Sequence, residues 1–168
     1  MILRVQRREI SASAADWPAC PGSYLLVMTV QPALRLRVGA LGWQLFPEGV
    51  YVYCGSALGP GGLRARVRRH VEGAGRLHWH IDHLLRRVRV QEVWIRTGVQ
   101  RLECEWASAL AREGACDCPV ARFGSSDCRC RAHLWRTRRG DIELESLFRR
   151  LAAAPRLLWR ANARTDML

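Results

Sequence analysis

Three side chains that can act on a phosphate ester lie within one short part of the sequence. Tyr53 is near the end of a segment that predicts a strand, and Arg66 and His70 follow it after a glycine-rich turn. Residues four apart share one face of a helix, so Arg66 and His70 are expected to point the same way. A tyrosine, an arginine and a histidine beside a helix N-terminus suit an anionic ester better than a sugar or a lipid.

The elements that position these side chains follow from spacing. Leu63, Val67 and Val71 recur every four residues, which predicts a helix over about 62–72 with an apolar face for a core. Gly73–Gly75 is expected to end that helix. Three further arginines of the same helix are predicted to contact a nucleic-acid backbone, or else to lie on the solvated surface: Arg64, Arg68 and Arg69.

The arrangement resembles the signature of the GIY-YIG nuclease superfamily. Gly22–Tyr24 is similar to the first motif and Tyr53–Gly55 to the second. Arg66 and His70 then follow in the family's order, and Glu103 supplies the glutamate that the family carries on a later helix. The match covers roughly residues 20–110.

The resemblance implies a role for each residue in the hydrolysis of a phosphodiester. Tyr53, or alternatively Tyr24, receives or relays the proton of the attacking water, the arginine and histidine bind the phosphoryl oxygens, and the glutamate holds one Mg²⁺ or Mn²⁺. One carboxylate completed by waters and a phosphate oxygen is ordinary coordination for magnesium. Glu105 is the alternative metal ligand, two residues away. The predicted catalytic residues are Tyr24, Tyr53, Arg66, His70 and Glu103.

A closer resemblance is to a compact GIY-YIG branch of unassigned role, sometimes fused to endonuclease III-type glycosylases. The segments LHWHID at 77–82 and FGSSDCRC at 123–130 carry it and extend the match to about residue 136. The chain departs from the wider family in having Ser23 where the first motif has isoleucine. The interval between the two motifs is also long, and the expected later asparagine is missing. These departures favour an alternative, a non-catalytic nucleic-acid-binding or DNA-repair accessory module.

Histidines and cysteines define two further candidate sites. His78 and His80 are predicted to contact nucleic acid. Cys128, Cys130 and His133 carry zinc-binding groups and need one more ligand to complete a site, for which the candidates are Cys104, Cys116 and Cys118. Zinc sites more often contain two cysteines separated by two residues, so an interpretation as free thiols in a loop stays open.

Composition bounds the kind of protein. A chain of 168 residues forms one domain with a sizeable core. The formal charge of +12, contributed entirely by arginine, favours a polyanionic partner, with DNA as the first expectation. The sequence lacks a run of 18 apolar residues and the core of a signal peptide, so no membrane association is predicted. Seven cysteines, an odd number, are typical of thiols or metal ligands in a cytoplasmic protein.

The order of predicted elements indicates an α+β fold, a small and mainly antiparallel sheet flanked by helices. Strands are predicted over about 23–30, 34–38, 50–54 and 90–95. Helices are predicted over about 62–72, 78–86 and 101–113. The stretch 39–47 and the Cys-rich segment 116–130 are expected to be loop. The chain thus divides into an N-terminal lead-in (1–19), a GIY-YIG-like nuclease domain (20–136) and a helical C-terminal tail (137–168).

Overall fold

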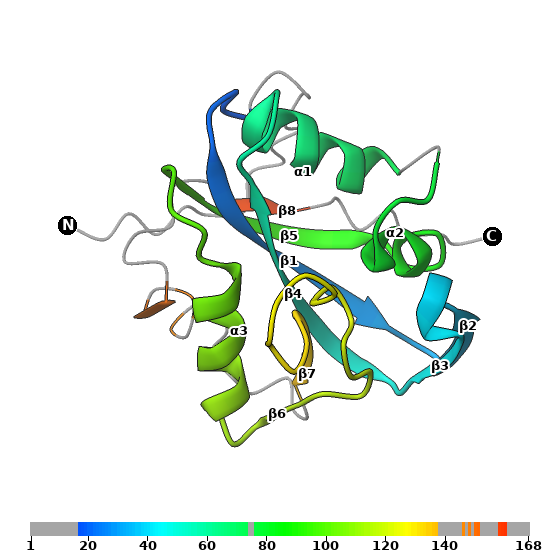
Figure 1. Cartoon of the computed structure of the whole chain (residues 1–168). Coiled ribbons are helices and arrows are strands. Elements are labelled where there is room, and N and C mark those ends of the chain that lie inside the picture. Colours follow the sequence, from blue (N-terminus) through cyan, green and yellow to red (C-terminus); the bar gives the residue numbers. More distant parts are fainter. Residues whose placement is uncertain are drawn as a thin grey trace.

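The fold is α+β, as the sequence predicts, with one main antiparallel sheet and helices packed against it (Figure 1). The computed structural model describes residues 17–73, 76–137, 146, 148, 150, 151 and 158–160. Among these residues, every helix is too short or too polar to cross a membrane.

Six strands form the main sheet in the order β6-β7-β4-β1-β5-β8, and every pair is antiparallel. Their bounds are β1 Gly22–Val30, β4 Gly49–Ala57, β5 Val90–Thr97, β6 Cys116–Asp117, β7 Leu134–Thr137 and β8 Leu158–Arg160. A separate two-stranded sheet pairs β2 (Leu34–Arg37) with β3 (Trp43–Phe46).

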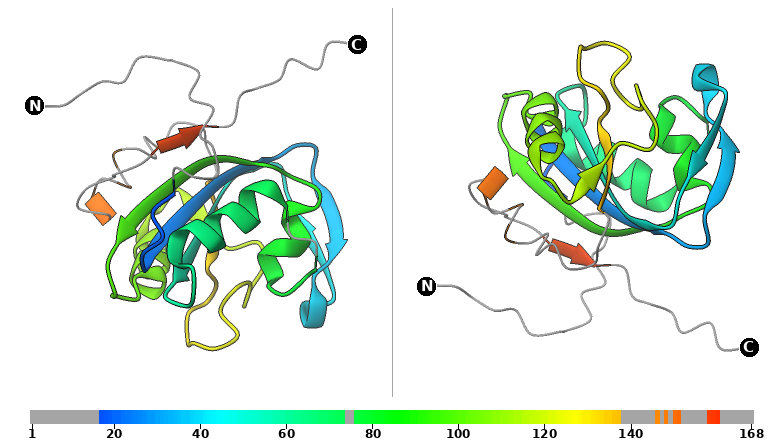
Figure 2. Two further views of the ribbon diagram at one scale, coloured as in Figure 1. Left: turned by 90° about the horizontal axis from the view of Figure 1, so that it is seen from above. Right: turned by 90° about the horizontal axis from the view of Figure 1, so that it is seen from below.

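Helices cover both faces of the main sheet. On one face, α1 (Gly62–Glu72) and α2 (His80–Leu85) lie together (Figure 2). Their apolar side chains pack on alternate residues of β1 and β4. On the other face, α3 (Glu103–Arg112) packs against the intervening residues of the same strands. Because side chains of a strand alternate between faces, β1 and β4 contribute to both cores.

The structure corrects several predicted boundaries. The stretch 39–47, predicted as loop, contains β3, whose short run alternates in exposure but is flanked by Gly42 and Pro47. The Cys-rich segment, also predicted as loop, begins with β6. The start of α2 shifts from 78 to His80, because the Asp82 carboxylate accepts the backbone N–H groups just before the helix.

The predicted helical tail is only partly correct. Residues 146, 148, 150 and 151 are helical, and Phe148 is fully buried against Trp94 of β5. Leu158–Arg160, by contrast, is a strand that pairs with Glu92–Trp94. The rest of the tail, and most of the predicted lead-in 1–19, lie outside the described residues.

Candidate functional site

A pocket of about 430 Å³ opens beside β1 and β4. Its wall is completed by α1, the segment that precedes α2, the start of α3 and the loop that leads into β7. Four of the five predicted catalytic residues line it: Tyr24, Tyr53, Arg66 and Glu103. Both predicted nucleic-acid contacts from the histidine-rich segment line it too: His78 and His80.

The strand register puts the two tyrosines on one face of the sheet. Tyr24 lies opposite Gly55, and Tyr53 lies opposite Leu26, two residues further along β1. Directly paired residues share a face, so both rings project toward α1 and α2. Gly55 is required here, since a Cβ at this position would overlap the Tyr24 ring. The glycine of the second motif therefore makes room for the tyrosine of the first.

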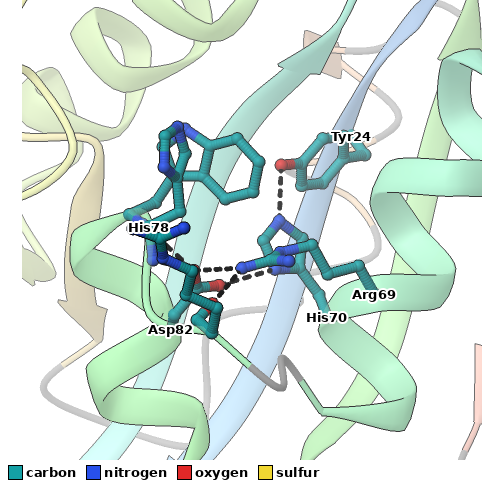
Figure 3. A network of polar contacts seen from close by, with 7 residues as sticks. Tyr24, Arg69, His70, His78 and Asp82 are labelled. Atoms are coloured by element: carbon teal, nitrogen blue, oxygen red, sulfur yellow. Dashed lines mark hydrogen bonds and ion pairs between the residues drawn. The ribbon is translucent and has the colours of Figure 1, made fainter. Parts of the chain in front are cut away.

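A buried chain of contacts runs behind Tyr24 (Figure 3). Its phenol oxygen lies 2.9 Å from Nε2 of His70. Nδ1 of His70 lies 3.6 Å from Oδ1 of Asp82, a distance longer than a hydrogen bond, and neither atom has a hydrogen-bond partner among the described residues. His70 is only 3% exposed and does not line the pocket, so it is placed to act on Tyr24 rather than to touch a phosphate as predicted.

Asp82 is held in place by several donors. Its Oδ2 atom accepts hydrogen bonds from the backbone N–H of His78 (2.8 Å), the backbone N–H of Trp79 (3.0 Å) and Nη2 of Arg69 (3.0 Å). Burial by itself would raise the pKa of Asp82, but the contacts with His70, the two amides and Arg69 outweigh burial and keep that pKa well below its usual range. Asp82 is therefore a buried carboxylate anion.

His70 and the two tyrosines are neutral near pH 7. Burial lowers the pKa of His70, although the Asp82 carboxylate opposes that effect. Burial also raises the pKa of Tyr24 and of Tyr53, while the nearby Arg66 guanidinium opposes the rise. A neutral imidazole thus faces a neutral phenol, which is the arrangement in which a proton can pass from oxygen to nitrogen.

Among the residues that the structure describes, Arg66 and Arg101 are the two arginines that line the pocket, and Arg66 lies beside the tyrosines. Its guanidinium carbon lies 3.9 Å from the centroid of the Trp79 ring, which fixes the plane of the group beside the two tyrosines. Arg69 contacts the same ring from 5.0 Å. Trp79 was not predicted as a functional residue, and its position between two histidines was the only signal for it.

The other arginines of α1 have partners within the protein. Arg64 donates to the backbone oxygen of Trp17 at 2.8 Å, and Arg68 pairs with Glu72 at 2.8 Å on the exposed side of the helix. The Arg69 guanidinium is bonded to Asp82, and its side chain is 30% exposed. Nucleic-acid contact by Arg64, Arg68 and Arg69 stays a prediction.

Glu103 lies at the first turn of α3 and is 6% exposed. Its Oε1 atom is 3.3 Å from Nε of Arg101, whereas its buried Oε2 atom has no hydrogen-bond partner among the described residues. Glu105, the alternative ligand, is exposed and does not line the pocket. Of the two carboxylates, only Glu103 has an oxygen that a cation in the pocket could reach.

Ser23, which departs from the family motif, has a positioning role. Its hydroxyl oxygen accepts the backbone N–H of Leu102 at 3.1 Å and donates to the backbone oxygen of Gln100 at 3.3 Å. Both residues immediately precede α3. The serine therefore ties β1 to the segment that presents Glu103, a function that an isoleucine would not provide.

A cluster of four metal-binding groups lies next to Glu103. The ligand atoms of Cys104, Cys128, Cys130 and His133 are all within 4.8 Å of one another, and the cluster could hold a metal ion such as zinc. The three predicted ligands are thus brought together. Of the three cysteines that the sequence left as candidates for the fourth ligand, the structure brings Cys104 into the cluster.

Comparisons with known proteins identify the family alone. Neither the curated proteins nor the solved structures contain a match to this chain. A family model described as a domain of unknown function, DUF123, matches residues 23–153. The match covers well over half of the chain and includes every residue that lines the pocket. The protein therefore belongs to the DUF123 family.

Proposed function

We propose that the protein is a GIY-YIG-like nuclease that hydrolyses a phosphodiester of nucleic acid, DNA first, with one Mg²⁺ or Mn²⁺. One observation carries the proposal: Tyr24, Tyr53, Arg66 and Glu103 converge on one pocket, in which Glu103 has an oxygen without a partner among the described residues. The net charge of +12 supports a polyanionic substrate.

The donor set of the pocket fits a hard divalent cation. Oε2 of Glu103 is a buried carboxylate oxygen that lacks a hydrogen-bond donor in the described part of the chain. A single carboxylate with waters and a substrate oxygen is the usual protein environment of Mg²⁺. When bound, the cation supplies positive charge beside the scissile phosphate. Asp127, exposed on the same wall, is a second oxygen donor within the pocket.

The chain itself provides a path for the proton of the attacking water. As the water oxygen forms its bond to phosphorus, its proton goes to the Tyr24 phenol oxygen, and the phenol proton passes to Nε2 of His70. Asp82 stabilises the imidazolium that results. The bond from phosphorus to the leaving sugar oxygen breaks, and that oxygen takes up a proton from solvent.

The chain also provides for the phosphate. Arg66, held against Trp79, offers a planar pair of donors to the phosphoryl oxygens. Charge on these oxygens grows in the transition state, so a fixed guanidinium is worth more there than in the ground state. Tyr53, on the same face as Tyr24, can donate its phenol proton to a second oxygen.

A binding module without turnover is the second candidate. It is favoured by the burial of Tyr24, which is 1% exposed and already bonded to His70. In that case the pocket would bind a nucleic-acid phosphate and stop there. The two functions differ in a single measurable property, metal-dependent cleavage.

The test uses labelled duplex, single-stranded, flap, junction and abasic DNA, and matching RNA, with Mg²⁺ or Mn²⁺ and with chelator. We expect cleavage of at least one substrate that requires the metal. Glu103→Gln should reduce it by at least about a hundredfold, since a metal site supplies several kcal/mol of transition-state stabilisation. Glu105→Gln, an exposed carboxylate of the same helix, is the matched control and should cleave normally.

Binding is measured on the same variants by fluorescence anisotropy. Glu103→Gln removes a carboxylate rather than a phosphate contact, so affinity should be nearly unchanged. Wild-type protein that binds these substrates and cleaves none of them would support the binding module. Metal-dependent cleavage that survives Glu103→Gln would overturn the assignment of the ligand.

A further inference from the structure

We propose that one zinc ion is bound in a closed structural site by Cys104, Cys128, Cys130 and His133. The ion holds the start of α3 against the loop that precedes β7. The proposal does not rest on the proposed hydrolysis. It goes beyond the observation that four metal-binding groups lie close together, because it names zinc as the metal, one ion per chain, and the two parts of the pocket that the ion joins.

The separations between the ligand atoms fit a tetrahedral zinc site. Ordinary Zn–S and Zn–N bond lengths at a tetrahedral angle place a sulfur and a nitrogen about 3.6 Å apart, and two sulfurs about 3.8 Å apart. Nε2 of His133 lies 3.6 Å from Sγ of Cys104 and 3.4 Å from Sγ of Cys128. All four ligand atoms lie within 4.8 Å of one another, so they surround one point.

The chemistry of the donors selects zinc over a hard cation. Three thiols and one imidazole are soft and intermediate ligands, which suit zinc and do not suit Mg²⁺ or Ca²⁺. Four protein ligands leave no open position, as in sites that serve structure rather than catalysis. All three cysteines are free rather than joined in disulfides, so each sulfur is available to a metal.

The loop that carries three of the ligands is held in shape by its own hydrogen bonds. The backbone N–H of Arg122 bonds to the oxygen of Arg131 at 2.7 Å, and that of His133 bonds to the oxygen of Phe123 at 2.8 Å. Nη1 of Arg122 donates to the backbone oxygens of Cys128 and Cys130, at 2.9 and 3.1 Å. The guanidinium therefore holds Cys128 and Cys130 together through their backbone oxygens.

The ion would join two parts of the pocket that are far apart in the sequence. Cys104 follows Glu103 in the first turn of α3, while the loop that precedes β7 also carries Ser126 and Asp127, which line the same pocket. Across this wall the chain provides the long ion pair between Arg101 and Asp127, at 3.7 Å and largely exposed. A zinc ion bound by both parts therefore fixes the position of the pocket wall.

The first experiment measures metal content. Full-length protein purified under reducing conditions with zinc in the growth medium should contain one zinc per chain by inductively coupled plasma analysis. Modification of the thiols should release that zinc stoichiometrically to a chromogenic chelator. Reconstitution with Co²⁺ should give thiolate-to-cobalt charge-transfer absorption and the strong visible bands of a tetrahedral site. Iron in place of zinc, or a zinc content near zero in zinc-supplied protein, would overturn the proposal.

The second experiment compares two cysteine variants. Cys128→Ser should lose the bound zinc and the cobalt charge-transfer band, whereas Cys20→Ser, which lies outside the cluster, should keep both. Equal zinc content in the two variants would contradict the site. If Cys128→Ser does not fold, the wild-type protein still decides the matter. Chelation should lower its melting temperature, and added Zn²⁺ should restore it where Mg²⁺ does not. A melting temperature that neither chelation nor added Zn²⁺ changes would rule out a structural role for zinc.

Discussion

Two sides of the candidate site differ in what compensates the charge of their buried polar groups. The histidine wall, made of Tyr24 in the pocket and of His70 and Asp82 behind it, supports a buried negative charge with donors from the chain itself. The cysteine wall, made of Glu103 and the four-ligand cluster, leaves a carboxylate oxygen without a partner among the described residues and gathers thiols around one point. Buried polar groups are nearly always paired in folded proteins. On the histidine wall, Nδ1 of His70 and Oδ1 of Asp82 face each other without a hydrogen bond, and Nε of the adjacent Arg69 also lacks a partner among the described residues. The two walls therefore differ in what compensates their charge, which is donors of the chain on the first wall and cations from outside on the second.

The difference separates what the fold supplies from what binding must supply. On the histidine wall, the Tyr24 phenol is held ready whether or not a metal is present. On the cysteine wall, zinc would fix the backbone and a second cation would reach Glu103. Removing a residue from the first wall should therefore damage the fold, and removing a cation should damage the second wall alone.

The largest effect is expected at Asp82. Asp82→Ala leaves the Arg69 guanidinium without its partner and two backbone N–H groups without an acceptor. Breaking a buried pair in this way costs about 3–5 kcal/mol of stability. Glu72→Ala, which removes an exposed ion pair with Arg68, is the control and should cost less than about 1 kcal/mol. Urea denaturation measures both; similar losses would mean that the histidine wall does not hold the fold.

The two tyrosines should differ in their effect on the rate. Tyr24→Phe removes the phenol bonded to His70, and should lower cleavage by at least about a hundredfold if Tyr24 relays the proton. Tyr53→Phe removes only a donor to the phosphate, so its loss should be smaller. Single-turnover rates at saturating metal give the comparison. A larger loss in Tyr53→Phe would return the relay to Tyr53, the residue that the motif resemblance favours.

Acid should weaken the fold through the histidine wall. Burial lowers the pKa of His70 in the folded protein. Below about pH 6.5, the ordinary pKa of histidine, the unfolded chain therefore binds a proton at this residue that the folded chain does not bind. The contribution of neutral His70 to the free energy of unfolding is therefore fully present above about pH 6.5. It is lost as the pH decreases, by at most about 1.4 kcal/mol per pH unit for one group. The lowered pKa of Asp82 adds a loss in the same direction below about pH 4.

His70→Gln isolates this contribution, because glutamine does not titrate. The variant should be less stable at pH 7.5 and lose less stability than the wild type between pH 6.5 and pH 5, as followed by urea midpoints. The groups that face His70 are Tyr24, Asp82, Arg66 and Arg69, and all remain in the variant. Parallel pH profiles for the two proteins would assign the acid sensitivity to other groups.

Local pattern was enough to predict the elements that carry the tyrosines and Arg66. The spacing of Leu63 and Val67 identified α1 to within a residue, because a helix packed on a sheet must repeat its apolar side chains near every fourth residue. β3 was missed because its four residues carry an exposed Trp43 and Leu45 and lie between turn-forming residues. Short edge strands lack the apolar run that marks a buried one.

The candidate site, too, was only partly predictable from the sequence. The residues of the proposed mechanism were predicted from motif order, but the placement of His70 behind Tyr24 was not, since helical spacing alone put it beside Arg66. Asp82 acts through backbone amides of its own turn, a contact that depends on where α2 begins. Cys104 joins ligands of a distant loop only after α3 packs on the sheet, which sequence spacing does not reveal.

The smallest effect expected is on the salt dependence of binding, and it tests how α1 contacts nucleic acid. Each phosphate contact contributes about 0.9 to the slope of log affinity against log salt, so one contact changes affinity about fourfold between 50 and 200 mM salt. Arg66→Ala should reduce the slope by about that amount, because its guanidinium faces the pocket. Arg68→Ala should reduce it by less than half as much, because Arg68 is paired with Glu72. Equal changes in the two variants would mean that the whole basic face of α1 follows the backbone, and that the pocket is not what fixes the phosphate.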